Sequence, residues 1–125
     1  MTTETRSAAP TATRLEVAWA HELAAAADAH KTGDLSEEWL HLERAHILSQ
    51  PRAGLHLRTH AAMLRAATRR RDAREAAGQL VRLVLAAPGS LSGRYPTGNT
   101  GGADVSAFRP MPIPDDLQAI LAKEA

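Results

Sequence analysis

Two pairs of acid and imidazole side chains stand out, because their spacing places each pair on one face of a helix. Glu43 and His46 are three residues apart, so both project from the same side of a helical segment. His56 and His60 are four residues apart, with the same consequence for the next segment. An antiparallel turn near Pro51 would bring His46 level with His56. The spacing therefore predicts that the four side chains meet between two helices.

A further carboxylate, Glu22, lies in the middle of an otherwise apolar helical face. A turn at Gly33 would bring Glu22 level with Glu43, and Glu43 is level with His60 across the later turn. A buried carboxylate without a partner costs several kcal/mol, so it is normally paired or bound to a cation. Carboxylate and imidazole groups together suit zinc, iron, manganese or copper. The predicted metal ligands are Glu43, His46, His56 and His60, with Glu22 as a fifth ligand or as their hydrogen-bond partner.

Two other interpretations of these residues stay open. In the first, they form a metal-free polar core hydrogen-bonded to Arg44 or Arg58, and the chain is a protein-interaction module. In the second, a histidine–glutamate pair acts as the general base of a metal-free enzyme on a small molecule. With a metal, the chain would be a metal handler or a small metalloenzyme, in which the ion acts as Lewis acid or water activator. The sequence identifies no catalytic residue.

The elements that position these residues are predicted to be helices. Alanine, leucine and arginine dominate the chain and aromatic residues make up only 3% of it, which favours an all-α fold over a sheet. Thr13 and Glu16 form a capping-box pattern, and Asp34 and Asp72 are typical N-caps. The expected helices cover residues 13–30, 34–50, 52–70 and 72–87.

The capping signals at Asp34 and Asp72 repeat with a period of about 38 residues, and a proline closes each half. This pattern predicts two tandem helical hairpins, and its spacing resembles that of the tetratricopeptide repeat. A plain four-helix bundle is the alternative. The fourth helix is expected to end at Pro88 and to bury one apolar stripe, made of Leu80, Leu83, Val84 and Ala87.

Most of the prolines and glycines lie in residues 88–114, which predicts an irregular segment without helix or strand. The segment keeps large apolar residues such as Tyr95 and Phe108, so we expect an ordered arm packed over the helices. A short helix is expected over 114–124, opened by a proline and two aspartates. The predicted organisation is a disordered tail at 1–12 and one helical domain at 13–125.

Composition excludes several classes of function. The chain has no cysteine, so it forms no disulfide and no thiolate metal site. Its formal net charge is +1, and its one arginine cluster has no stacking aromatics, so no nucleic-acid partner is expected. The segment from Gly98 to Gly102 is not a P-loop, because no lysine followed by serine or threonine comes after it and it opens no helix. Its backbone amides could bind an anion, but its glycines are better explained by a tight turn. No organic cofactor is predicted. No apolar run reaches the length of about 20 residues that a bilayer requires. A cytoplasmic protein is expected, with a metal ion or small molecule as ligand, and with a protein partner or homodimer compatible with the pattern.

Two strings together resemble an uncharacterised bacterial family of short helical proteins. The first is WLHLERAHIL at residues 39–48, and the second runs from GNTGG to FRPMPIP within residues 98–114. The resemblance implies a bacterial, intracellular protein in which the arm is part of the fold. It implies no catalytic residue. The pairing of the two strings further predicts that the arm lies over the end of the helices that carries Glu43 and His46.

Overall fold

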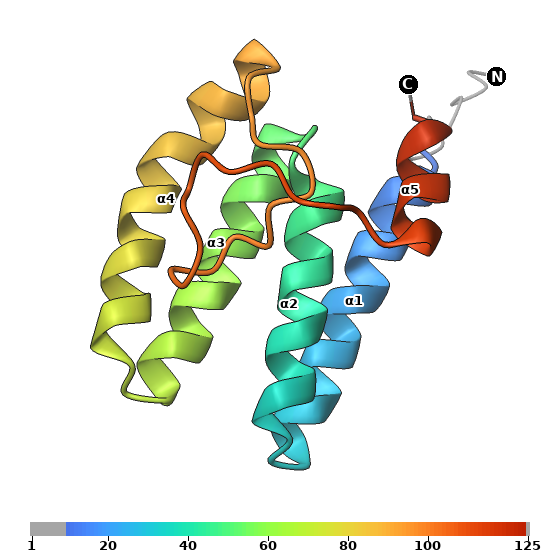
Figure 1. Ribbon diagram of the computed structural model, residues 1–125. Coiled ribbons are helices and arrows are strands. Elements are labelled where there is room, and N and C mark those ends of the chain that lie inside the picture. The colour runs from blue at the N-terminus through green and yellow to red at the C-terminus, as the bar shows by residue number, and fades with distance from the viewer. Residues whose placement is uncertain (1–9, 125) are drawn as a thin grey trace, which may run out of the picture.

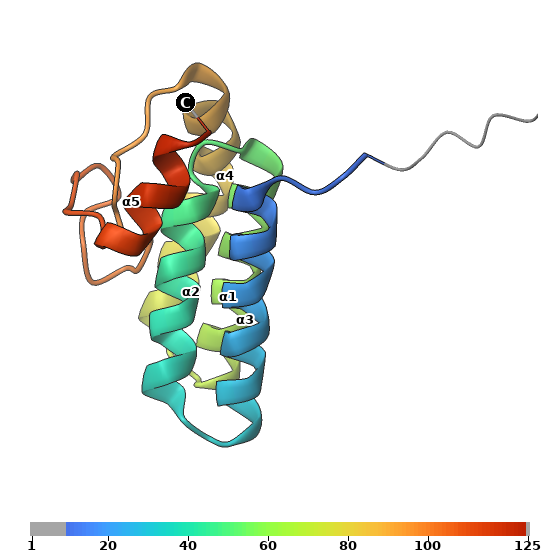
Figure 2. The ribbon, with the colours of Figure 1, turned by 90° about the vertical axis from the view of Figure 1, so that its right-hand side faces the viewer.

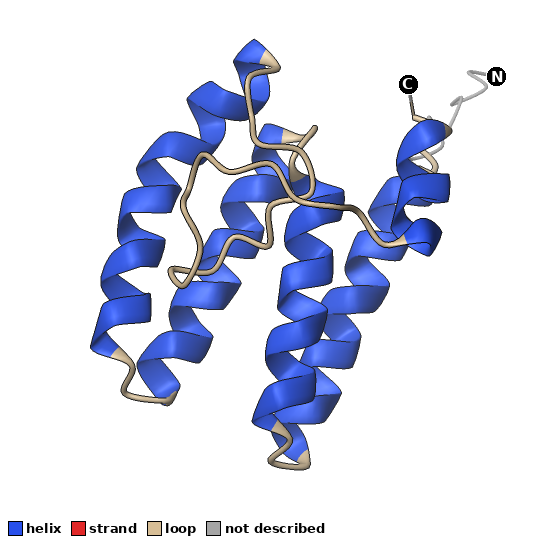
Figure 3. Cartoon of the chain, in the orientation of Figure 1, coloured by secondary structure: helices blue, strands red, loops and turns tan. Residues whose placement is uncertain are grey.

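Five α-helices form the regular structure of residues 10–124, the part of the chain that the computed structural model describes. They are α1 (Arg14–Lys31), α2 (Leu35–Ser49), α3 (Ala53–Arg69), α4 (Ala73–Ser92) and α5 (Asp115–Ala122). No strand occurs in these residues, which confirms the all-α prediction (Figure 3). Of the predicted tail, residues 1–9 lie outside the described part, and 10–12 precede α1 without helical structure. Across 10–124, no helix combines the length and the apolar character needed to traverse a bilayer.

The predicted caps begin the first, second and fourth helices. The Thr13 hydroxyl accepts a hydrogen bond from the Glu16 backbone N–H, and the Glu16 carboxylate accepts one from the Thr13 N–H. Asp34 and Asp72 cap α2 and α4, each by accepting from the backbone N–H three residues later. Gly33 turns the chain between α1 and α2 with a φ of 77°, which a residue with a Cβ adopts only under strain.

The helices pack in chain order, α1 against α2, α2 against α3 and α3 against α4 (Figures 1 and 2). Helix α5 lies across one end of α1 and α2. Two apolar clusters fill the space between helices, one around Leu48 and Leu117 and one around Met63 and Leu42. The indole of Trp19 packs with the first cluster, and its Nε1 donates to Thr59 Oγ1 at 2.9 Å.

Helix α4 runs through Pro88 to Ser92, so the prediction that it ends at Pro88 was wrong. A proline inside a helix leaves the carbonyl four residues earlier without its donor, but here that carbonyl belongs to Val84 on the solvent side, where water can satisfy it. Beyond the proline, Ser90 fixes the last turn, because its hydroxyl donates to the carbonyl of Gln50. The helix then ends at Gly93, whose φ of 70° is a left-handed cap.

The predicted buried stripe of α4 was also wrong. The side chains of Leu80 and Val84 are 56% and 75% exposed, and the fully buried residues of this helix are Gln79, Ala86 and Ser90. Helix α4 packs on α3 at one end of the packing order of the four long helices, and α1 lies at the other end. The inner face of α4 carries polar groups such as Gln79 that pair with α3, whereas Leu80 and Val84 are exposed on its outer side.

The arm, residues 93–114 here, is ordered and lies against the helices, as expected (Figure 1). The amide of Gln50 holds its first part, because it donates to the Pro96 carbonyl at 2.9 Å and accepts from the Gly98 N–H at 3.1 Å. The buried Asn99 side chain closes the loop that follows, with Nδ2 donating to two arm carbonyls. The irregular segment thus satisfies its own buried polar groups and keeps a defined shape.

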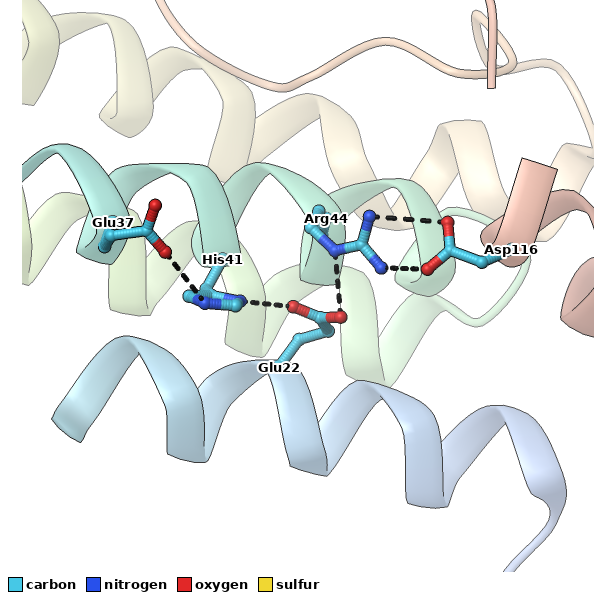
Figure 4. Close-up of polar contacts among 5 residues, drawn as sticks. All are labelled: Glu22, Glu37, His41, Arg44 and Asp116. Atoms are coloured by element: carbon cyan, nitrogen blue, oxygen red, sulfur yellow. Dashed lines mark hydrogen bonds and ion pairs between the residues drawn. The ribbon is translucent and has the colours of Figure 1, made fainter. Parts of the chain in front are cut away.

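Glu22 belongs to an ion-pair network that ties α1, α2 and α5 together (Figure 4). Its carboxylate contacts His41 Nδ1 at 2.7 Å and accepts from Arg44 Nε at 2.9 Å. Arg44 continues the network to Asp116 on α5, and the Arg44 hydrogen bond lowers the pKa of that carboxyl. The buried charge of Glu22 is therefore compensated by side chains of the protein itself.

We expect Glu22→Gln to destabilise the protein by about 1–3 kcal/mol, because the change leaves Arg44 and His41 without their shared buried counter-charge. Urea unfolding followed by circular dichroism measures the loss. Glu37→Gln is the matched control, because Glu37 is exposed and lies 3.5 Å from the same His41. Equal stability of wild type and Glu22→Gln would show that this network contributes nothing to the fold.

Candidate metal centre

Three buried histidines converge on one point between α2 and α3. The Nε2 atoms of His46 and His56 are 2.9 Å apart, and each lies 3.1 Å from Nε2 of His60. The register of the two helices is the one predicted, because His46 on α2 faces the two histidines of α3. All three residues are at least 94% buried. These three form the group able to hold a metal ion among the residues that the structure describes.

The outer nitrogen of His46 is fixed by the arm. Its Nδ1 lies 2.7 Å from the backbone carbonyl of Asn99. A carbonyl oxygen can only accept a hydrogen bond, so Nδ1 carries the ring proton. The neutral ring then has a lone pair at Nε2, which points to the other two histidines.

The outer nitrogen of His56 is fixed by α4. Its Nδ1 lies 2.8 Å from the hydroxyl oxygen of Ser90. The Ser90 hydroxyl donates its hydrogen to the Gln50 carbonyl at 2.6 Å, so its oxygen accepts a hydrogen bond from the His56 imidazole. His56 therefore also carries its proton on Nδ1 and presents a lone pair at Nε2.

His60 follows the same rule through Gln79 of α4. The Gln79 amide nitrogen donates to Gly101 O at 2.9 Å and to Glu75 Oε1 at 3.1 Å, which identifies its oxygen as the acceptor. That oxygen lies 2.6 Å from His60 Nδ1 and receives its proton. Glu75 therefore accepts a hydrogen bond from the amide that in turn accepts from His60. Carboxylates often play this part directly for metal-bound imidazoles, and the arrangement makes His60 a stronger donor ligand.

The result is three lone pairs about 3 Å apart with no proton between them, which is a repulsive arrangement unless a cation occupies the centre. Burial lowers the pKa of His46 well below its usual value, and the two neighbouring imidazoles lower it further. Burial likewise lowers the pKa of His56 and of His60 to about 4. For a zinc ion with bonds of about 2.0–2.1 Å and tetrahedral angles, the nitrogens would stand about 3.3 Å apart. The triad fits an ion after small movements of the rings.

A glycine of the arm seals one side of the triad. Gly101 has a φ of 85°, and a Cβ at this position would come within 2.6 Å of the His46 ring. Only hydrogen fits between the backbone and the imidazole. The arm therefore lies on His46, as the pairing of the two sequence strings predicted.

The two predicted carboxylate ligands lie apart from this group. Glu22 is held by His41 and Arg44 in the network of Figure 4. Glu43 is half-buried, and burial raises its pKa to about 7, helped by the charges of Asp104 and Glu75. Glu43 lies one helical turn from His46 on α2, and the charged groups near it are acidic: Asp104 in the arm and Glu75 on α4.

Sequence reasoning missed the groups that orient the imidazoles. Ser90 falls within residues 88–114, which the sequence predicts to be irregular because Pro88 is expected to end the fourth helix. Gln79 on a helix and Asn99 in a glycine-rich loop have no distinguishing pattern in one sequence. The available signal was the short string around Asn99, whose glycines allow the backbone to approach a ring closely.

A cavity of about 90 Å³ opens directly onto the three imidazoles. Helix α4 and the arm supply its walls, including Arg82 from α4 and Tyr95 and Phe108 from the arm. Because the protein offers three imidazoles, a fourth position on a bound ion would face this space.

The comparisons with known proteins place the chain in a family. A family model described as "Protein of unknown function (DUF3703)" matches residues 13–121. The chain belongs to this family. The DUF3703 match includes all four long helices, the arm and most of α5, so every residue of the candidate centre lies inside it. No curated protein and no solved structure matches the chain.

We expect Gly101→Ala to weaken metal binding about 10–100-fold and to destabilise the protein, because the methyl group would displace the His46 ring. Calorimetric titration with Zn²⁺ and thermal unfolding measure the two effects. Gly54→Ala is the matched control, because a Cβ there meets nothing within 4 Å and alanine favours the helix. Equal zinc affinity in the two variants would contradict the packing argument.

The raised pKa of Glu43 predicts a pH dependence of stability for the metal-free protein. The folded protein holds this proton up to about pH 7, whereas the unfolded chain releases it near the ordinary glutamate pKa of 4.5. Unfolding free energy should therefore fall between those pH values and stay low above them. At pH 8 the unfolding free energy of Glu43→Gln should exceed that of the wild type by on the order of 1 kcal/mol, a figure already reduced for the solvent exposure of the carboxylate. At pH 4 the two should be equal. Urea unfolding at both pH values measures the difference, and an equal effect at both would contradict the assignment.

Proposed function

We propose that the chain binds one divalent transition-metal ion through Nε2 of His46, His56 and His60. The observation that carries the proposal is the proton arrangement of the triad. Three different acceptors hold the three Nδ1 protons, and all three lone pairs point to one centre. A satisfied polar core would instead place a hydrogen between neighbouring nitrogens. Within the triad the imidazoles pair with neutral oxygens, so these three residues give no support to a histidine–glutamate base at this site.

The ligand set favours particular ions. Neutral imidazole nitrogens suit zinc, copper, nickel and iron, whereas magnesium and calcium require oxygen ligands. Buried histidines of low pKa keep their lone pairs free well below neutral pH, so protons compete weakly for the site. The ordered groups behind each ring reduce the freedom that the ligands lose on binding.

The number of ligands favours a site with an exchangeable position. Structural zinc sites are closed by four protein ligands, whereas catalytic sites have three and leave the fourth to water or substrate. Here the cavity beside the triad supplies that open side. We propose a small metalloprotein of the second kind, in which the ion acts as Lewis acid or activates a bound water.

We expect protein purified without a histidine tag to contain about one equivalent of transition metal, measured by elemental analysis. Adding Zn²⁺ to the metal-free protein at about 100 times the dissociation constant should stabilise it by about 2.7 kcal/mol, seen as a higher unfolding temperature. In His46→Ala and His60→Ala the affinity should fall about 100-fold or more, because a direct ligand is lost. His21→Ala is the control, because His21 is exposed on α1.

Three results would contradict the proposal. The first is less than about a tenth of an equivalent of metal together with no stabilisation by any added ion. The second is zinc binding that is unchanged in His46→Ala and His60→Ala. The third is a loss of affinity of the same size in His21→Ala, which would assign binding to surface histidines.

A further inference from the structure

We propose that the cavity beside the triad binds a small oxyanion, with one oxygen on the metal ion and another held by Arg82. The inference rests on the proposed metal site and names the class of ligand that completes it. The relevant chemistry is that of phosphate, hydrogencarbonate or a short carboxylate, which share a negative charge and at least two oxygen acceptors.

The size of the cavity sets the upper limit on this ligand. A space of about 90 Å³ holds several waters, since one water needs roughly 10–15 Å³ by this measure. A group with one central atom and three or four oxygens fits within this space. The lining is mixed: the three imidazoles and Arg82 supply polar groups, and Leu85 and Ala86 are among the apolar residues.

The charge balance determines the sign of the ligand. Among the described residues, those that line the cavity include Arg82 and Arg94 and no aspartate or glutamate. A divalent ion on three neutral imidazoles would add two further positive charges at the same place. Such a concentration of charge in a largely buried site is unfavourable without a counter-ion. A negatively charged group at the open position supplies it, whereas a neutral water molecule does not.

Arg82 is held in the position that the proposal requires. Its guanidinium donates to Val105 O at 2.8 Å from one terminal nitrogen and to Gly78 O at 3.2 Å from the other. An arginine has five N–H donors, so these two bonds orient the group and leave donors for an anion. Arg82 and all three histidines of the triad line the same cavity. The guanidinium and the imidazole nitrogens therefore border the same space.

The experiment uses the full-length chain loaded with Co²⁺, whose visible absorption reports its ligands. Inorganic phosphate and hydrogencarbonate are added separately, with perchlorate at equal ionic strength as control. We expect both oxyanions to shift the cobalt bands saturably and perchlorate to leave them unchanged. Ultrafiltration must show that cobalt stays with the protein.

Three variants test the role of the guanidinium. In Arg82→Met, oxyanion affinity should fall about 10–100-fold, while cobalt affinity stays equal or rises because a repelling charge is removed. In Arg94→Met the oxyanion affinity should fall less, by about 2–5-fold, because Arg94 is exposed and its charge is screened by solvent and salt. This second variant does not disturb the contact between α4 and the arm. Arg74→Met, exposed at the start of α4, is the control and should match the wild type.

The outcomes separate the inference from the metal proposal. Absence of cobalt binding overturns both. If cobalt binds tightly but its absorption bands do not change with 100 equivalents or more of either oxyanion, the inference is overturned and the metal site stands. Removal of cobalt into the filtrate by phosphate overturns it as well, and so does an unchanged oxyanion affinity in Arg82→Met.

Discussion

The candidate centre depends on where three protons lie. Each imidazole has one hydrogen, and each hydrogen is drawn outward by an oxygen that belongs to a different part of the chain: a carbonyl of the arm, a hydroxyl at the end of α4, and an amide in the middle of α4. Helices α2 and α3 supply only the rings. The direction of the lone pairs is set by residues 19 to 53 positions away in sequence, so the chemistry belongs to the assembled fold and to no single helix.

The local architecture could be predicted from the sequence because it depends on short-range patterns. Thr13, Asp34 and Asp72 cap helices as expected, since a side-chain oxygen three residues before a free N–H acts without help from the rest of the fold. The convergence of His46 with His56 and His60 could also be predicted, because an antiparallel turn at a known residue determines the register of two helices. The family assignment agreed with the resemblance of the two strings.

The remaining errors have one physical origin, which is that tertiary partners outweigh local preference. Pro88 stays inside α4 because Ser90 has a buried acceptor beyond it. Leu80 and Val84 face outward because the inner side of α4 must carry Gln79. The sequence pattern places Glu22 on the apolar face of its helix, yet its charge is paired with Arg44. The helical pattern of α2 alone places Arg44 at the edge of the buried face and does not reveal this pair. A single sequence contains each of these residues but does not state which long-range pair it forms.

The contact between the Asn99 carbonyl and His46 has a consequence for biosynthesis. When α4 has just left the ribosome, all three rings exist, but that of His46 has nothing to hold its hydrogen and can rotate between tautomers. The final quarter of the polypeptide must fold back before the three nitrogens are aligned. For the metal site proposed above, ion binding would therefore come late in folding, and a chain that ends before Asn99 would carry the three histidines without the carbonyl that orients His46.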